Sequence, residues 1–381
     1  MYNPKTIKER IIRYIEMGHN FNKKNMNYGS LYIQGRPGIG KSDVIKQICE
    51  ENGYGLKVVY MSILPIEKLT GLPQPNGEKG VIWSRPELVN FDDVLLSPKD
   101  EDKPMILFLD DAHLINRQYQ NYLFELLIYR QINNWKLGEN TIIILAGNKP
   151  DDNANFQPIL APVVNRISFC ELTNNVKNWS EFAASNNVSM DVISYLNFDD
   201  SLFIGEPLES YPWPSPRSWT YFGQELEFLS NKNVELNIEE LTDIANGYVG
   251  KDAALSFIKY HKLYKKWNKK HVLSDKFING IDKYDIIDVF SALVKCYMDI
   301  LNEYLDNRKI DKYFQSLESL VKLFTNIILN QKLKTVMPVV LQIILVDMKN
   351  RKNIDKEISN KTISMILENE TISNIVYDLI V

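Results

Sequence analysis

The chain has 381 residues and a formal net charge of −4, with 45% hydrophobic and 24% charged residues. This balance is typical of a soluble globular protein, and the length exceeds one ordinary core, so we expect two or three subdomains. No run reaches the roughly 18 consecutive apolar residues that a membrane helix needs, and the charged N-terminal segment excludes a signal peptide. An acidic balance also speaks against a protein that works by binding nucleic-acid phosphates.

The cysteines and histidines give no sign of a metal or disulfide framework. Three widely spaced cysteines, Cys49, Cys170 and Cys296, favour reduced thiols and a cytoplasmic location. Cys49 and Cys170 each lie in an apolar run, where we expect core side chains. The four histidines have no metal-ligand spacing with these cysteines, so we assign no transition metal.

The first half of the chain alternates strand and helix patterns. Strands are predicted for residues 30–34, 56–62, 105–110, 141–148 and 166–172, and helices for residues 4–17, 43–52 and 116–131. Residues 63–89, which are rich in turn-forming Gly, Pro and Asn, are expected to be irregular. Alternation of this kind predicts a parallel sheet covered on both faces.

After residue 173 the strand patterns stop and every segment reads as helical. We therefore predict three parts: an α/β core over residues 1–173, a helical lid over residues 174–270, and a helical C-terminal extension over residues 271–381. The predicted fold class is an α/β P-loop sheet core with a helical lid and an all-α extension.

The stretch "GRPGIGKS" satisfies the pattern G-x-x-x-x-G-K-[ST] between a predicted strand and a predicted helix. Glycines at such positions let backbone N–H groups turn towards phosphates, while the lysine reaches the β- and γ-phosphates and the serine hydroxyl binds Mg²⁺. This is the most specific signal in the sequence. The predicted phosphate-binding residues are Gly35, Arg36, Pro37, Gly38, Ile39, Gly40, Lys41, Ser42 and Asp43.

The run "MILFLDDAHL" is an apolar strand that ends in Asp110 and Asp111. In a P-loop nucleotide hydrolase the first acid lies where Mg²⁺ is held and the second positions the attacking water. We therefore predict a Mg²⁺ site formed by Ser42 and Asp110. An alternative is that Asp110 or Asp111 caps the helix that follows.

The order of these features resembles that of the AAA+ ATPases and, within them, the MoxR-like group of bacteria and phages. "GRPGIGKS" and "ILFLDDAH" resemble the Walker A and Walker B motifs. "ILAGN", which ends in Asn148, is similar to sensor 1, a polar residue on the strand between the two Walker strands that faces the γ-phosphate. The segment that begins at Leu64 resembles the region that carries the helix-2 insert of this group.

The resemblance also implies roles for two arginines. "LAPVVNRISF" is similar to the segment that presents an arginine, here Arg166, to the neighbouring subunit. "PSPRSW" resembles the sensor 2 segment at the start of a lid helix, which would make Arg217 a γ-phosphate contact. An arginine is disfavoured at a helix start unless an anion is near, and this supports the second assignment. Asn148 could instead only cap a turn, and Arg166 could be an ordinary surface residue.

By this resemblance the chain is an ATP hydrolase that uses ATP and Mg²⁺, with Asp111, Asn148, Arg166 and Arg217 in catalysis. It would act as a ring oligomer, expected to be a hexamer, to remodel or mature a partner protein, for which a von Willebrand factor A domain is a candidate. The departure is Asp111, which stands where the group has glutamate. Its shorter arm predicts slow hydrolysis, because a misplacement of about 1 Å can lower a rate by about 10²-fold.

Two alternative functions remain open. A nucleic-acid motor or loader is suggested by "HKLYKKWNKKH", residues 261–271, where lysines alternate with aromatic residues that could stack on bases. An ATP-gated scaffold with very slow hydrolysis is suggested by Asp111. Trp83, Arg85 and the stretch from Leu69 to Pro73 are candidates for contacts with a partner or a central channel.

Overall fold

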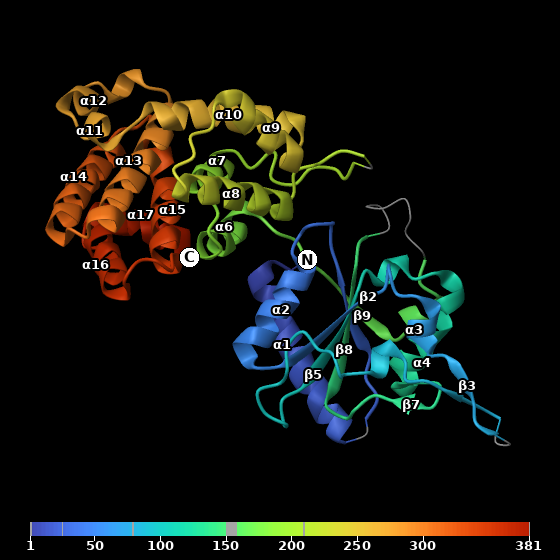
Figure 1. The fold of residues 1–381 in the computed structure, drawn as a ribbon. Coiled ribbons are helices and arrows are strands. Elements are labelled where there is room, and N and C mark those ends of the chain that lie inside the picture. The colour runs from blue at the N-terminus through green and yellow to red at the C-terminus, as the bar shows by residue number, and fades with distance from the viewer. Residues whose placement is uncertain (1, 25, 78–79, 150–157, 209, 381) are drawn as a thin grey trace. The chain divides into compact units, whose positions relative to one another are not determined.

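The computed structural model describes residues 2–24, 26–77, 80–149, 158–208 and 210–380. The chain divides into two compact units, which we name the α/β unit (Met1–Asn174) and the helical unit (Asn175–Val381) (Figure 1). Among the described helices, none combines the length and the apolar character that crossing a membrane requires. The division of the helical residues at 270 stays a prediction.

The α/β unit contains a five-stranded parallel sheet whose strand order is β2-β5-β8-β1-β9. Its strands are β1 (Ser30–Gln34), β2 (Gly55–Tyr60), β5 (Met105–Asp110), β8 (Thr141–Gly147) and β9 (Ile167–Glu171). Its helices are α1 (Pro4–Lys23), α2 (Lys41–Asn52), α3 (Ile66–Thr70), α4 (Gln120–Tyr129) and α5 (Ala161–Val164). All five predicted strands are present, and the near-continuous burial of β5 and β8 is typical of a sheet with both faces covered.

Helices cover both faces of this sheet, α1 and α2 on one side and α3 and α4 on the other (Figure 1). Alternate residues along each strand point to opposite faces. One face of β5 and β8 therefore packs with Leu123 and Leu126 of α4 in a single buried cluster, which Leu107 of β5 and Ile143 of β8 also join. Cys49 and Cys170 are buried free thiols, as expected.

The first helix runs six residues beyond the predicted end at residue 17. Gly18, the first residue after the predicted end, lies buried inside α1. A Cβ atom at this position would lie 2.9 Å from the Tyr28 hydroxyl and 3.0 Å from Ile142, so the glycine serves close packing rather than helix termination.

Residues 63–89 are more ordered than predicted, and a second hairpin, for which we predicted no strand, follows helix α4. The first hairpin joins β3 (Pro73–Pro75) to β4 (Val81–Trp83), although residues 78–79 at its tip lie outside the described part of the chain. The second joins β6 (Gln131–Ile132) to β7 (Trp135–Lys136). The Trp135 indole N–H donates to the Trp83 carbonyl over 2.9 Å, so the two hairpins, together called the hairpin pair, contact each other.

The helical unit consists of helices throughout its described residues. They are α6 (Val176–Ser185), α7 (Met190–Phe198), α8 (Pro216–Asn231), α9 (Ile238–Val249), α10 (Lys251–Lys266), α11 (Lys269–Val272), α12 (Asp275–Asn279), α13 (Ile286–Asn307), α14 (Ile310–Ile328), α15 (Met337–Asn350), α16 (Lys356–Leu367) and α17 (Glu370–Ile380). One buried hydrophobic cluster extends from Val176 on α6 to Val376 on α17. Helix α15 packs against α6 and α7, so the last helices share the core of the first ones.

A buried polar network connects α13 to α15 within this core. The Tyr297 hydroxyl donates to Asp347 over 2.6 Å, and Arg351 donates to both carboxylate oxygens of Asp347 at 2.8–3.1 Å. Asp347 is only 1% exposed, so its charge depends on these partners.

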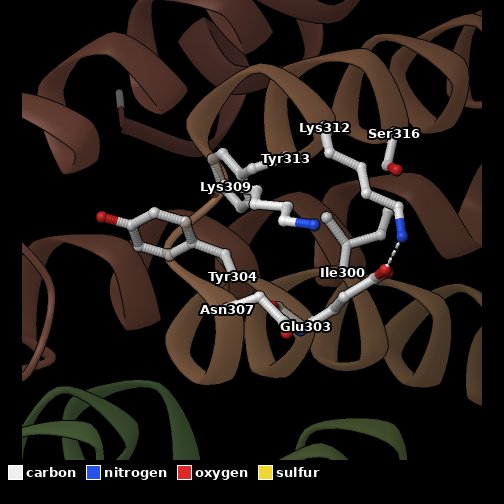
Figure 2. A pocket seen from close by; sticks show the side chains of 8 residues that line it. All are labelled: Ile300, Glu303, Tyr304, Asn307, Lys309, Lys312, Tyr313 and Ser316. Atoms are coloured by element: carbon white, nitrogen blue, oxygen red, sulfur yellow. Dashed lines mark hydrogen bonds and ion pairs between the residues drawn. The ribbon is translucent and has the colours of Figure 1, made fainter.

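Near the C-terminal end of α13, Glu303 forms ion pairs with Lys269 and with Lys312, the second of which is drawn in Figure 2. Figure 2 shows Glu303 and Lys312 at the rim of a small pocket between α13 and α14. Hydrogen bonds from the two ammonium groups lower the pKa of Glu303 to about 2.

Candidate nucleotide-binding site

The phosphate-binding loop follows β1 and ends in the first turn of α2. Gly40 caps α2 with a φ of 104° and a left-handed backbone, a conformation that glycine adopts without steric cost. No atom lies within 4 Å of where a Cβ at Gly40 would be, so the loop is open at this point. The first N–H groups of α2 have no partner within the helix, and together with the helix dipole they favour an anion here.

Two predicted pairs of residues meet at the carboxyl edge of the sheet. The Lys41 ammonium donates to the Asn148 side-chain oxygen over 2.9 Å and to the Gly35 carbonyl over 2.8 Å. The Ser42 hydroxyl donates to Asp110 over 2.5 Å. Asn148 follows β8, which lies between β1 and β5 in the sheet, as the resemblance to sensor 1 implies. The ammonium of Lys41, the amide of Asn148 and the carboxylate of Asp110 thus lie together at the carboxyl ends of β1, β8 and β5.

Asp110 is a buried carboxylate with defined hydrogen-bond donors. It is 6% exposed, and besides Ser42 it accepts the backbone N–H of Asp111 over 2.9 Å. Burial raises the pKa of the Asp110 carboxyl, and the hydrogen bond from Ser42 opposes that rise.

A metal at this position would need further ligands. The described part of the chain has no group of three His, Cys, Asp or Glu side chains that could hold a metal ion alone. Mg²⁺ is commonly bound by one or two carboxylates together with substrate phosphates and water. Ser42 and Asp110, beside an open phosphate loop, fit that mode.

Asp111 adopts a left-handed backbone with φ 55° and ψ 33°. Aspartate is among the few non-glycine residues that tolerate this region. Its side chain accepts a hydrogen bond from the Ser62 hydroxyl over 3.3 Å. Ser62, which follows β2, was not among the predicted site residues. Its place just after a parallel strand was the signal that could have revealed it, because the carboxyl ends of parallel strands share one edge.

His113 is a second residue that the sequence did not reveal. It lies in a 3-10 turn, Ala112–Leu114, and its side chain is fully buried. Its Nδ1 accepts the backbone N–H of Asn148 over 3.3 Å, which places the imidazole proton on Nε2. Burial lowers the pKa of His113, and this favours the neutral form that can accept. The motif "DDAH" contained the residue but gave no sign of its partner.

Arg166 contacts other residues of the α/β unit, and Arg217 belongs to the helical unit. Arg166 immediately precedes β9, at the amino edge of the sheet, where its guanidinium donates to the Pro162 carbonyl over 2.7 Å and lies 5.0 Å from the Phe124 ring centre. Arg217 is an exposed residue in the first turn of α8, in the helical unit. Their assigned roles stay predictions.

The lysine-rich stretch 261–271 does not present its aromatic residues to solvent. Tyr264 is 6% exposed and Trp267 is 2% exposed, so both belong to the core of the helical unit. Stacking on bases requires exposed rings. The aromatic residues of this stretch are therefore core side chains, while its lysines Lys262, Lys265, Lys266 and Lys270 are exposed.

Comparison with known families identifies part of the chain. Residues 31–155 match the model of the ATPase family associated with various cellular activities (AAA). This segment of the chain is similar to an AAA domain. The match includes the phosphate-binding loop, Asp110, Asp111 and Asn148, and it ends before Arg166. The prediction of a P-loop sheet core followed by a helical region is confirmed, since the matched residues contain most of the parallel sheet, β9 follows them, and the helices of the helical unit come next.

Solved structures similar to this chain include NtrX from Brucella abortus, with 14% identity over 57% of this chain and 51% of that chain and a TM-score of 0.32. Another is a mutant RuvB from Thermotoga maritima, with 12% identity over 75% of this chain and 81% of that chain and a TM-score of 0.35. The match therefore spans about half the length of the NtrX chain. No curated protein matches the sequence at a significant level.

Proposed function

We propose that this chain is a MoxR-like AAA+ ATPase that binds and hydrolyses ATP with Mg²⁺ in a ring oligomer, and uses the cycle to remodel or mature a partner protein. The observation that carries the proposal is the convergence of Lys41, Asn148, Ser42 and Asp110 around an open phosphate loop, within the residues that match the AAA family model. Positioning and charge stabilisation by such groups supply most of the catalysis in phosphoryl transfer.

In this proposal each residue has a separate task. Lys41 and the N–H groups at the start of α2 bind the phosphates, and Asn148 orients the terminal phosphate. Ser42 and Asp110 would hold Mg²⁺, which neutralises phosphate charge. Asp111 orients the attacking water and accepts its proton, and Ser62 fixes the direction of the Asp111 carboxylate.

The position of Arg166 supports a site shared between subunits. It stands at the amino end of β9, whereas the phosphate loop follows the carboxyl end of the neighbouring strand β1. Four residue steps of strand separate these ends by about 13 Å, and the Arg166 side chain is held at Pro162 and Phe124. Arg166 is therefore suited to serve a neighbour's nucleotide rather than its own, and a ring would supply that neighbour.

The hairpin pair supports an interaction with a protein partner. Leu72, Val81, Ile82 and Trp135 are exposed apolar residues on or beside it, with exposed fractions of 38–58%. Grouped apolar residues of this kind mark interaction surfaces. The Asn133 amide donates to the Thr70 carbonyl over 2.8 Å and holds the second hairpin against the end of α3. A partner with a von Willebrand factor A domain is part of the proposal by resemblance to the MoxR-like group.

Steady-state ATP hydrolysis measured across protein concentrations tests the central claim. We expect turnover that rises with concentration and is lost in Lys41→Ala and in Asp111→Asn. Asp111→Asn is the sharper control, because asparagine tolerates the left-handed backbone while it removes the charge. If wild type binds ATP and assembles but shows no turnover, the ATP-gated scaffold replaces the hydrolase.

A mixing experiment tests the shared site. We expect Arg166→Ala to lower turnover by about 10³-fold or more, as for other arginines supplied by a neighbour. Mixing it with Lys41→Ala should restore activity, because a Lys41→Ala subunit still offers its arginine to an intact phosphate loop. With random mixing about a quarter of the sites would be complete. Absence of any restoration would argue against the shared site, while the hydrolase claim would stand.

A further inference from the structure

One short turn carries three groups that contact the candidate site. Asp110 ends β5, Asp111 bends the chain with its left-handed backbone, and His113 follows in the 3-10 turn. The Leu114 N–H donates to the Asp111 carbonyl over 2.9 Å and closes that turn. The bend directs the His113 imidazole back towards the end of β8, where Nδ1 accepts the Asn148 N–H.

The end of β8 is shaped to admit the imidazole. A Cβ at Gly147 would lie 3.0 Å from His113 Nδ1, so the ring packs directly against the backbone at this residue. The next residue, Asn148, has its N–H held by His113 and its side-chain oxygen held by Lys41. Both ends of Asn148 are therefore fixed, one by the Asp110–Asp111 turn and the other by the phosphate loop.

We propose that His113 is a positioning residue for Asn148: by accepting the Asn148 backbone N–H, its imidazole fixes the amide that meets Lys41 and couples it to the turn that carries Asp110 and Asp111. This inference rests on the proposed function, in which Asn148 orients the terminal phosphate. The presence or loss of the terminal phosphate at Asn148 would then change the positions of Asp110 and Asp111 through the His113 imidazole. A histidine that merely fills the core would have no such effect on nucleotide discrimination.

Two kinds of substitution at His113 distinguish the effect of its hydrogen-bond acceptor from the effect of its side-chain volume. His113→Phe replaces the imidazole by a somewhat larger apolar ring and His113→Leu by a branched apolar chain, and both remove the acceptor and leave the Asn148 N–H unpaired. His113→Asn places a carbonyl oxygen at the position of Nδ1 and keeps the acceptor. Thermal unfolding of each variant identifies those that fold, and two acceptor-free variants are available in case one does not.

The experiment measures equilibrium binding of ATP and of ADP, together with kcat and KM, for wild type, the three His113 variants, Asn148→Ala and the double variant His113→Phe/Asn148→Ala. We expect His113→Phe to lower kcat about 10- to 100-fold while KM changes little, because small displacements of a positioning group act on the rate. It should reduce the preference for ATP over ADP as Asn148→Ala does, and His113→Asn should retain both properties. The double variant should be no worse than Asn148→Ala alone, because the two residues act as a unit.

The outcomes separate this inference from the proposed function. If wild type hydrolyses ATP and the acceptor-free variants keep its kcat and its preference for ATP, the positioning role is wrong and the ATPase stands. Additive effects in the double variant would also overturn it. If wild type binds ATP without hydrolysing it, the hydrolase claim fails, and the ratio of ATP to ADP affinity still decides the role of His113. If wild type binds neither nucleotide, both proposals fall.

Discussion

Gly147 is expected to tolerate no side chain, and a second substitution should relieve the damage. A Cβ at this position would lie 2.1 Å from the Tyr32 hydroxyl oxygen, whereas ordinary contacts begin near 3.4 Å. The hydroxyl would have to move by about 1.3 Å within a fully buried cluster, and overpacking of this kind costs about 1–3 kcal/mol. Because β8 is a central strand and cannot retreat, we expect Gly147→Ala to cost about 3 kcal/mol.

Tyr32→Phe removes the atom that causes the closest contact. The distances that remain, to the Tyr32 ring carbon Cζ and to His113 Nδ1, are both 3.0 Å and need shifts of only a few tenths of an ångström. The Tyr32 hydroxyl is buried and has no hydrogen-bond partner among the described residues, so its removal alone should be neutral or stabilising by about 1 kcal/mol. The double variant should thus recover at least about 1 kcal/mol relative to Gly147→Ala.

Equilibrium urea unfolding of wild type, both single variants and the double variant measures this coupling. Free energies of unfolding that add within about 0.5 kcal/mol would refute the steric argument, because independent sites behave in that way. A marked loss of stability in Tyr32→Phe would mean that the hydroxyl has a partner such as an ordered water. Nucleotide binding provides a second readout, because a Cβ at Gly147 would also lie 3.0 Å from His113 Nδ1, and we propose that His113 positions Asn148.

Three further predictions concern the helical unit. Asp347→Ala should cost about 3–5 kcal/mol in urea unfolding, because it leaves the Arg351 charge without its buried partner. Burial raises the pKa of Glu227, so the stability that its neutral form contributes is present below about pH 4.3 and is lost as pH rises through the folded pKa. Glu227→Gln, which cannot ionise, should therefore gain stability relative to wild type as pH rises from about 5 to about 8. A difference in unfolding free energy that stays constant over this range would contradict the prediction. Two lysines lower the pKa of Glu303 to about 2, so the stability that its charged form contributes is present above about pH 4.3 and is lost as pH falls towards 2. Wild type should therefore be more stable than Glu303→Gln at neutral pH, and the difference should shrink in that pH window and in high salt. A constant difference would contradict the prediction.

The α/β unit was predictable because its signals are local. Each buried strand is a short apolar run, and the phosphate-binding loop has fixed spacing between a strand and a helix. The hairpin of β6 and β7 was missed because the preceding helix ends at Tyr129 with Arg130 as its C-cap, and the left-handed φ of 52° at Arg130 is not a conformation that an arginine predicts. Asn133, with a φ of 51°, was the available turn signal, in a dipeptide of two asparagines.

Contacts between distant residues explain what the sequence did not reveal about the site. The pairs Lys41–Asn148 and Ser42–Asp110 join residues 107 and 68 positions apart; the P-loop and the acidic end of the strand suggested the second pair, while the resemblance gave Asn148 a role without its contact to Lys41. The contact of His113 with Asn148 depends on the backbone bend at Asp111, which no residue pattern encodes. Helix α1 was predicted to end before Gly18, a residue whose packing partner, Tyr28, comes from the segment after that helix.

The backbone at Asp111 also changes how its substitution for glutamate is understood. If only the length of the side chain is considered, an aspartate at position 111 reaches less far than the usual glutamate, and this predicts slow ATP hydrolysis. The left-handed conformation adds a second consideration, because aspartate occupies this region more readily than glutamate does. Asp111→Glu would gain one methylene of reach while it strains the turn by about 1 kcal/mol and disturbs His113 on the same turn. A slower Asp111→Glu variant would therefore not show that aspartate is the better base, whereas the loss of turnover in Asp111→Asn, with the turn intact, would show that the carboxylate is needed.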